Sequence, residues 1–346
     1  MKIFYSLAGE GLGHAIRTTA ILENLDKDIE VHLFTWGEAY KFFYEQNYPN
    51  LHKIASLHFG RDKNHIINPF LTLKNFLVFC RNYSASFGYI ARLADKANPD
   101  LMIADFECIL PRVAHAHGYP LFSIDNQHRF SRCELKGVSA SLRFYARCMG
   151  MFTELYVPRP QLAIISTFQH ADLKKLDART VIINSFVRKS LEQHPPVEKD
   201  YILLYYKSSF GGILEILAKI GENVKVYGCP PQDRITGNFE YCEISNEGFV
   251  KDLSGCKHLI CGAGNQLLGE GVFYGKPIMA IPEPNQPEQT INAFYIEKMQ
   301  YGIQCDLDQV SLDKVRFFLD NFKCRQGTAV NGAQEAVQYI HNFLKI

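Results

Sequence analysis

The stretch HLICGAGNQLLGEGVFYGKPIMAIPEPNQPEQTINAFYIEKMQYG, residues 258–302, contains the pattern that decides the fold. We interpret it as an apolar strand, a glycine turn at 262–264, a helix, a second apolar strand and a proline-rich loop before another helix. Backbone amides at the start of a helix favour an anion, because the positive end of the helix dipole lies there. The stretch therefore predicts a phosphate-binding turn. Glu270, on the helix, can accept hydrogen bonds from the hydroxyls of a ribose.

A second glycine loop follows the first predicted strand. In SLAGEGLGHAIRTTAILENL, residues 6–25, three glycines precede His14, and helical spacing of apolar residues follows. A dinucleotide-binding loop would have glycine where His14 stands, and the next strand would end in an acidic residue instead of FTW. These departures disfavour a nicotinamide or flavin site. A tight strand–helix turn carrying a surface histidine remains the simpler alternative.

The whole chain repeats the alternation of strands and helices. Expected elements include a strand at 51–59, a long helix at 70–96, and further segments at 150–157, 162–168 and 180–186. Strands separated by helices predict an α/β fold in which parallel sheets have helices on both faces. Residues 187–200 contain two prolines and many charges and read as a linker. We therefore expect an N-terminal domain at 1–186, a second domain at 187–330, and a C-terminal helix at 331–346 that can pack back on the first.

Composition narrows the class of protein. The chain has 346 residues, 47% of them hydrophobic, and a formal net charge of +1, so no overall charge favours nucleic acid. Ten cysteines without a C-x-x-C pair indicate neither a disulfide scaffold nor a zinc motif. We see no signal peptide and no stretch that would span a bilayer, and we expect a cytoplasmic protein. Residues 1–185 carry 21 Lys and Arg against 17 Asp and Glu, which suits an anionic acceptor or peripheral contact with the inner face of a membrane; a chance imbalance on solvated faces is the alternative.

The two glycine clusters together resemble GT-B glycosyltransferases, most closely the MurG-like family. Three segments carry the resemblance: GEGLGHAIR at 9–17, VIINSFVR at 181–188 and GAGNQLLGEGVFYGKPIMAIPEPNQPEQTINA at 262–293. It implies two Rossmann-like domains facing a central cleft, with a UDP-sugar bound mainly by the second domain. It implies that Glu270 holds the ribose and that Glu288 and Gln289 hold the donor sugar. Residues assigned to the donor are Gly11, Gly13, Arg188, Ser208, Ser209, Gly262, Gly264, Asn265, Glu270, Glu288 and Gln289.

The chemistry of sugar transfer needs a base for the acceptor hydroxyl. His14 is our candidate, and Asp105, at the tip of the strand in PDLMIADFE, is expected to orient it. Asp105 can instead cap the following helix. Glu107 is the rival candidate for orienting His14. Candidates for the acceptor side are Glu107, Asp125, Gln127 and His128, of which the last three stand in SIDNQH. No Asp-x-Asp motif follows one of the predicted strands, so neither a metal nor a cofactor beyond the UDP-sugar co-substrate is expected.

The leading hypothesis is an inverting transferase that moves a hexose, such as GlcNAc or glucose, from a UDP-sugar to a hydroxyl acceptor. The sequence does not name the acceptor; a lipid-linked or polymeric glycan, in cell-envelope or glycolipid synthesis, is the candidate. A UDP-sugar 2-epimerase of the same fold and a non-catalytic nucleotide-sugar-binding protein are the alternatives. An epimerase would need carboxylates and an arginine around the sugar, and the sequence does not offer a recognisable set.

Overall fold

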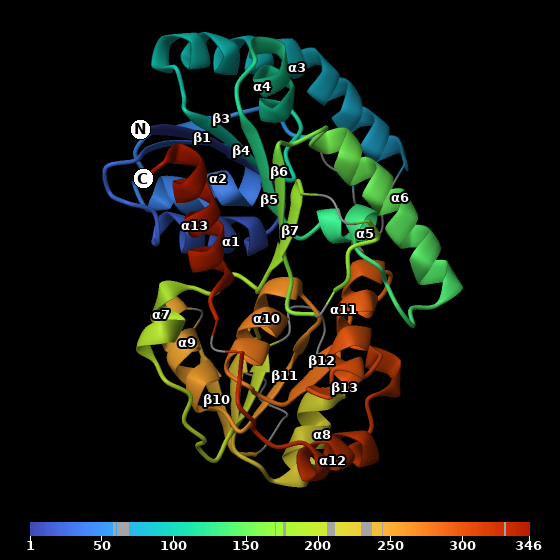
Figure 1. Ribbon diagram of the computed structural model, residues 1–346. Helices are drawn as coiled ribbons and strands as arrows, with labels where there is room; N and C mark the ends of the chain where they lie inside the picture. Colours follow the sequence, from blue (N-terminus) through green and yellow to red (C-terminus); the bar gives the residue numbers. More distant parts are fainter. Residues whose placement is uncertain are drawn as a thin grey trace.

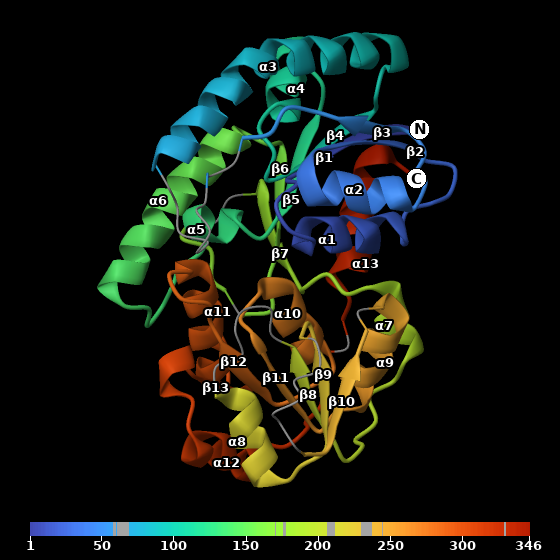
Figure 2. The same ribbon diagram turned by 180° about the vertical axis from the view of Figure 1, so that it is seen from behind.

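Two parallel β-sheets, each with helices on both faces, form two domains stacked one above the other (Figures 1 and 2). The computed structural model describes residues 1–346 except 58–59, 61–68, 170, 176–177, 206–211, 230–236, 244 and 329. All strand pairs in both sheets are parallel. This confirms the predicted fold class.

The first sheet has the strand order β3-β2-β1-β4-β5-β6-β7. Its strands are β1 (Lys2–Leu7), β2 (Glu30–Thr35), β3 (Leu51–Lys53), β4 (Leu101–Asp105), β5 (Leu121–Asp125), β6 (Leu162–Ser166) and β7 (Thr180–Ile183). Every residue of β4 and β5 is buried, as expected for parallel strands covered on both faces. Alternate residues of β1 point to opposite sides: Tyr5 lies in one apolar cluster and Phe4 in the other.

Helices of the first domain cover these two faces. They are α1 (Gly13–Leu22), α2 (Gly37–Glu45), α3 (Pro69–Ala97), α4 (Leu110–His117), α5 (His128–Arg132) and α6 (Ala140–Tyr156). Helices α1 and α2 share one apolar cluster with the sheet, and α3 and α4 share the other. Helices α5 and α6 lie towards the second domain (Figure 1).

The second sheet has the order β10-β9-β8-β11-β12-β13. Its strands are β8 (Ile202–Tyr205), β9 (Val224–Tyr227), β10 (Phe239–Cys242), β11 (His258–Gly262), β12 (Ile278–Ile281) and β13 (Gly302–Gln304). The helices are α7 (Lys189–Gln193), α8 (Ile213–Ile220), α9 (Asn246–Gly255), α10 (Asn265–Phe273), α11 (Pro287–Lys298) and α12 (Leu312–Asn321), with a 3₁₀ turn at Leu307–Gln309. Helices α9, α10 and α11 pack on one face and α8 and α12 on the other.

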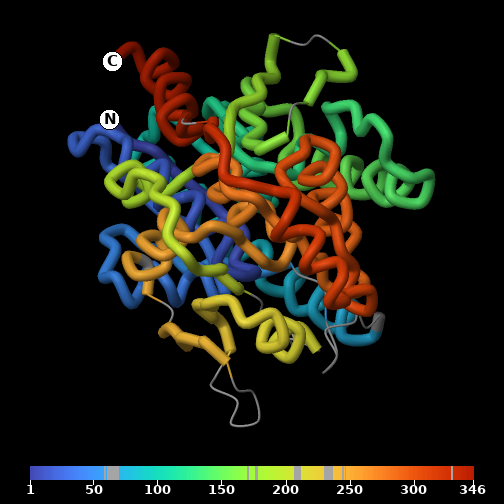
Figure 3. Tube along the Cα trace, turned by 90° about the horizontal axis from the view of Figure 1, so that it is seen from below, coloured from blue at the N-terminus to red at the C-terminus, as the bar shows by residue number. Residues whose placement is uncertain are grey.

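The chain crosses between the domains twice, and the two crossings lie side by side. The Gly332 amide donates to the Ser185 carbonyl at 3.0 Å, and the Asn331 side chain bonds both the amide and the carbonyl of Val187. A Cβ on Gly332 would lie 1.9 Å from the Asn184 carbonyl oxygen, so this close approach requires glycine. Helix α13 (Gly332–Leu344) follows and packs on α1 and β7, close to the N-terminus (Figure 3).

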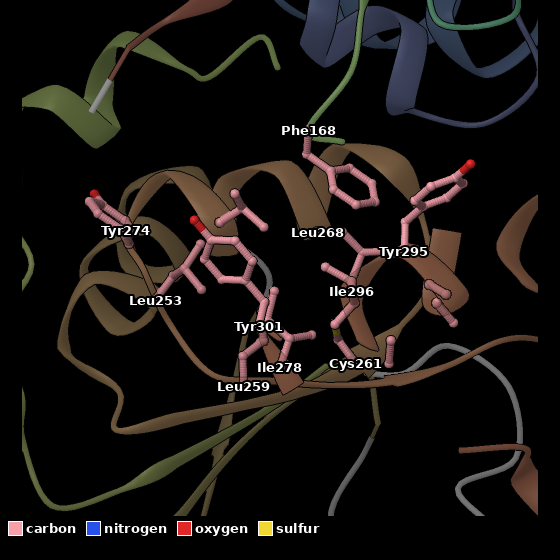
Figure 4. Packing of buried hydrophobic residues seen from close by; sticks show 14 of the residues in the cluster. Phe168, Leu253, Leu259, Cys261, Leu268, Tyr274, Ile278, Tyr295, Ile296 and Tyr301 are labelled. Carbon is pink, nitrogen blue, oxygen red and sulfur yellow. The ribbon is translucent and has the colours of Figure 1, made fainter. Parts of the chain in front are cut away.

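The apolar core of the second domain continues into the first. Phe130 and Phe168 of the first domain belong to the same buried cluster as Leu268 and Tyr295 of the second. Figure 4 shows Phe168 lying over Leu268 at α10. The two domains are therefore joined by a packed apolar interface.

Three elements differ from the sequence-based expectations. The strand expected at 51–59 is shorter, because β3 ends at Lys53. Residues 150–156 form the last turns of α6, because Ala146, Gly150 and Thr153 recur at helical spacing and form its buried face. The expected linker at 187–200 contains the short helix α7, which packs against α9.

Candidate active site

Each sheet has one point where its strand order reverses, between β1 and β4 in the first and between β8 and β11 in the second. Loops after adjacent strands diverge at such a point and leave a crevice at the carboxyl ends, where open α/β sheets bind ligands. The loop before α1 and the tip of β4 border the first crevice. The 262–264 turn borders the second, and its other border, residues 206–211, lies outside the described part of the chain.

The two candidate catalytic side chains meet at the first crevice. His14 is the second residue of α1 and Asp105 is the last residue of β4. His14 Nδ1 lies 3.0 Å from Asp105 Oδ1; the histidine side chain is 14% exposed and the carboxylate is fully buried. The imidazole therefore has one nitrogen against a buried acid and its outer edge near the surface.

Arg17, which the sequence analysis did not single out, completes this group. Its Nε donates to Asp105 Oδ2 at 3.0 Å, and its NH2 donates to Oδ1 at 2.6 Å. The same NH2 lies 2.8 Å from His14 Nδ1. Burial by itself would lower the pKa of Arg17, but the adjacent Asp105 carboxylate raises it above its usual value. Arg17 is thus a permanent cation buried beside the histidine.

Glu107, and not Asp105, caps the next helix. Its two carboxylate oxygens accept the Ile109 and Leu110 amides at 2.7 and 2.9 Å, at the start of α4. Burial raises the pKa of Glu107, and the bonds from these amides oppose that shift. Glu107 is 4% exposed and both of its carboxylate oxygens bind α4, while its assignment to the acceptor side stays a prediction. Asp105 was also considered as a cap of this helix. It does not cap α4, because Glu107 accepts the amides there and Asp105 binds Arg17 instead.

Asp125 and His128 bind each other instead of facing the cleft. His128 Nδ1 lies 2.7 Å from Asp125 Oδ2, which also accepts a hydrogen bond from Ser123 Oγ. Both side chains are fully buried. Burial by itself would raise the pKa of Asp125, but His128 and the hydrogen bonds lower it to about 2. The two residues thus form a buried polar pair between the end of β5 and the start of α5, and Gln127, beside them, is also buried; the assignment of all three to the acceptor side stays a prediction.

The next residue of this segment, Asn126, reaches the other domain. Its Nδ2 donates to Asn265 Oδ1 at 3.2 Å, at the start of α10. Arg129 also crosses the interface, and its NH2 donates to Asn292 Oδ1 of α11 at 2.6 Å. Arg129 is fully buried, and among the described residues its Nε and NH1 have no hydrogen-bond partner. The sequence signal for this contact was the arginine that directly follows DNQH, in the short helix HRFSR.

The helix starts at both crevices are open to an anion. Neither α1 nor α10 has a side-chain cap at its N-terminus. A Cβ on Gly11, Gly13 or Gly264 would meet none of the described residues within 4 Å, so these residues leave the backbone there uncovered. Gly262 ends β11, and Gly264 is the N-cap of α10. Backbone amides at these positions have the geometry to bind phosphate oxygens.

Glu270 has a different partner from the one expected. Arg188 Nε donates to Glu270 Oε1 at 2.9 Å and its NH2 donates to Oε2 at 2.6 Å. The Gln266 amide adds a third bond, to Oε1, at 3.0 Å. Glu270 is 1% exposed, so the protein itself binds both oxygens that a ribose would need. The structure pairs the two residues that the resemblance assigned to the donor, and ribose binding by Glu270 would require this pair to rearrange.

The remaining donor candidates lie at α11. Gln289 Oε1 accepts the Glu283 amide at 2.9 Å and so shapes the proline-rich loop. The Glu288 side chain is 30% exposed and lies 3.9 Å from Arg129. Ser208 and Ser209 lie outside the described residues.

The described part of the chain shows neither a metal-binding cluster nor a helix that could cross a membrane. Among those residues, no three His, Cys, Asp or Glu side chains gather as a metal-binding group. No helix among them combines the length and hydropathy needed to cross a bilayer.

Comparison with known proteins gives the family. Residues 1–323 match the model of the family described as glycosyl transferase family 1. The chain belongs to this family and is a glycosyltransferase. A search of curated proteins by sequence found no match.

Solved structures agree on the fold over the whole chain. The glycosyltransferase of kitacinnamycin has a TM-score of 0.68 at 14% identity, covering 99% of this chain and 98% of its own. MurG of Acinetobacter baumannii has a TM-score of 0.66 at 14% identity, with 99% of both chains covered. A UDP-glucosyltransferase of Polygonum tinctorium has a TM-score of 0.65 at 11% identity, covering 100% of this chain and 99% of its own. The expected GT-B fold, with its likeness to MurG, is confirmed, as is the transferase class.

Proposed function

We propose that this chain is an inverting glycosyltransferase that moves a hexose from a UDP-sugar to an acceptor hydroxyl, with His14 as the base. The observation that carries the proposal is the contact of His14 with the buried Asp105 carboxylate at the first crevice, 3.0 Å apart. Family membership supports the reaction class. The start of α10, which has no side-chain cap, supports an anionic donor held by the second domain, and α10 lies in contact with α1.

The proposed step moves one proton and one electron pair. The acceptor oxygen forms a bond to the anomeric carbon while the bond from that carbon to the UDP oxygen breaks. The acceptor proton passes to His14 Nε2, and the electron pair leaves with UDP. Attack on the side opposite the diphosphate inverts the anomeric centre. Amides at the start of α10 stabilise the charge that builds on the leaving group, and the base contributes about 10²–10⁴-fold.

A thermal-shift panel tests the donor. A ligand that binds only the folded state at about 100 times its Kd adds about 2.7 kcal/mol of stability. UDP, UDP-GlcNAc and UDP-glucose are expected to raise the Tm, dTDP less, and NAD not at all. A shift with NAD alone would contradict the proposal. Incubation with UDP-GlcNAc alone separates the epimerase alternative, because only an epimerase changes the sugar without an acceptor.

The acceptor in this proposal is amphiphilic and lies at a membrane surface. Six apolar side chains in the first three turns of α3 are exposed: Phe70, Leu71, Leu73, Phe76, Leu77 and Val78. Helix α6, which lies on the same side of the first domain in Figures 1 and 2, exposes Phe144, Met151, Phe152 and Leu155. Exposed Lys74, Arg81, Arg143 and Arg147 lie on the same two helices. Apolar and basic side chains together favour an anionic lipid surface.

Vesicle sedimentation tests this surface. We expect the protein to bind phosphatidylserine vesicles more tightly than phosphatidylcholine vesicles. The double substitution Phe76→Ser with Leu77→Ser should weaken binding. Phe317→Ser is the matched control, because Phe317 is 53% exposed but lies in the second domain. Equal loss in both variants, or no binding to either vesicle, would contradict membrane contact through α3.

A further inference from the structure

We propose that Arg17 is a positioning residue that acts as the standing counter-ion of Asp105, so that the His14 ring is free to stay neutral and accept a proton. This inference rests on the proposed role of His14 as base. It adds a third residue to that pair, from the same helix as His14 and one turn further along.

The charge balance at Asp105 carries the inference. The carboxylate is fully buried, and a buried anion without a partner is strongly disfavoured. Among the described residues, two groups supply positive charge to it: Arg17, and the His14 ring when protonated. If His14 were the counter-ion, the ring would already carry the proton that a base has to accept. Arg17 removes this conflict, because it supplies the charge in every protonation state of the ring.

Geometry gives Arg17 a second effect. The paired bonds of its Nε and NH2 hold both oxygens of Asp105, which directs Oδ1 to His14 Nδ1. If Nδ1 donates its hydrogen to Oδ1, the lone pair of the neutral ring is on Nε2, the nitrogen that must take the acceptor proton. The Arg17 NH2 also lies 2.8 Å from Nδ1 and can only donate, so this contact is a hydrogen bond only in the other tautomer, with the ring hydrogen on Nε2; the tautomer of the His14 ring therefore decides whether the alignment holds.

Other charged and titratable groups around Arg17 are consistent with this role. Tyr5 of β1 and Asp125 of β5 lie close enough to act on Arg17 electrostatically. Asp125 is already paired with His128, and burial raises the pKa of Tyr5 well above its usual value. Neither group competes with Asp105 for the guanidinium in the contacts above.

The test compares Arg17→Gln, Arg17→Lys and the matched control Arg132→Gln, in full-length protein. Arg132 also pairs with a carboxylate, that of Glu154, and does not contact His14 or Asp105. UDP release from a UDP-sugar is measured as kcat/KM against pH. In parallel, nitrogen-15 NMR follows the histidine rings without substrate, with His14→Gln identifying the His14 signal among the 12 histidines.

We expect Arg17→Gln to lower kcat/KM about tenfold or more at neutral pH. The acidic limb of the plot of kcat/KM against pH should move to higher pH by about one unit or more. The His14 ring signal should shift its titration by the same amount, and the KM for the donor should stay unchanged. Arg17→Lys keeps the positive charge but not the paired hydrogen bonds. The acidic limb of its pH profile should therefore stay near that of the wild type, while its kcat falls. Arg132→Gln should match the wild type in both readouts.

Two results would overturn the inference. One is an Arg17→Gln variant with a wild-type pH profile and ring titration. The other, which needs no variant at Arg17, is a wild-type His14 ring that is positively charged at neutral pH or carries its proton on Nε2. Full activity of His14→Gln is a separate outcome, because it refutes the proposed base while the ring titration still decides whether Arg17 keeps the ring neutral.

Discussion

The buried pair between Arg188 and Glu270 makes a quantitative prediction for Glu270→Gln. Two charge-assisted hydrogen bonds of 2.9 and 2.6 Å join a carboxylate that is 1% exposed to an arginine side chain that is 10% exposed. Removing one partner of a buried ion pair costs about 3–5 kcal/mol, because the other charge is left uncompensated. At ~2–4 °C per kcal/mol for a domain of this size, the Tm should fall by roughly 10 °C.

Two assays on the same variants separate stability from binding. Urea unfolding gives the loss of free energy, and calorimetric titration with UDP gives the affinity. The double variant Arg188→Met with Glu270→Leu is the control. Because an apolar pair leaves no buried charge, the double variant should lose less free energy of unfolding than Arg188→Met alone and Glu270→Leu alone lose in sum. A ribose contact by Glu270 would instead appear as a loss of UDP affinity.

The possible results test two separate statements: the stability argument from burial and the assignment of Glu270 to the ribose. A loss below about 1 kcal/mol in Glu270→Gln would refute the reasoning from burial. A large loss of stability with unchanged UDP affinity would show that Glu270 is a structural partner of Arg188 and that the ribose assignment is wrong. A tenfold loss of UDP affinity with little loss of stability would support the ribose assignment.

Three further predictions follow from single contacts. The pairing with His128 described above lowers the pKa of Asp125 from 3.8 to about 2. The Asp125 carboxylate therefore stabilises the fold above about pH 4, and this contribution is lost as the pH falls towards 2. Relative to Asp125→Asn, the wild type should therefore lose about 2 kcal/mol over that range in urea unfolding, and an equal pH dependence in both proteins would refute the pairing. Glu107→Ala should lower the free energy of unfolding by about 1 kcal/mol, because two amides at the start of α4 lose their acceptor; no change in urea midpoint would count against the cap. Gly264→Val should weaken UDP binding without loss of Tm, because its side chain would occupy the open space at the start of α10, and unchanged UDP affinity would place the diphosphate elsewhere.

Sequence reasoning located the crevices because their signals are local. A glycine turn between an apolar strand and a helix is visible within a few residues, and parallel topology then brings the tips of β1 and β4 together. The His14–Asp105 contact follows from that topology, although 91 positions separate the two residues. The family resemblance added the assignments in the second domain.

The contacts that the sequence did not reveal depend on packing between distant segments. Arg17 reads as a polar residue on an amphipathic helix, and nothing local shows that its side chain turns inward to Asp105. The resemblance assigned Glu270 to the ribose, and the sequence could not show its pairing with Arg188, which lies 82 residues away on the crossing between the domains. Arg129 could not be placed because its partner Asn292 belongs to the other domain.

The most direct test of the central claim is the rate of UDP release by the wild type and by His14→Gln. The donor is the UDP-sugar selected by the thermal-shift panel, at saturating concentration with a panel of hydroxyl acceptors. If His14 is the base, the variant should be about 10²–10⁴-fold slower while its Kd for the donor stays within about twofold. A variant that releases UDP as fast as the wild type would show that the acceptor proton goes elsewhere.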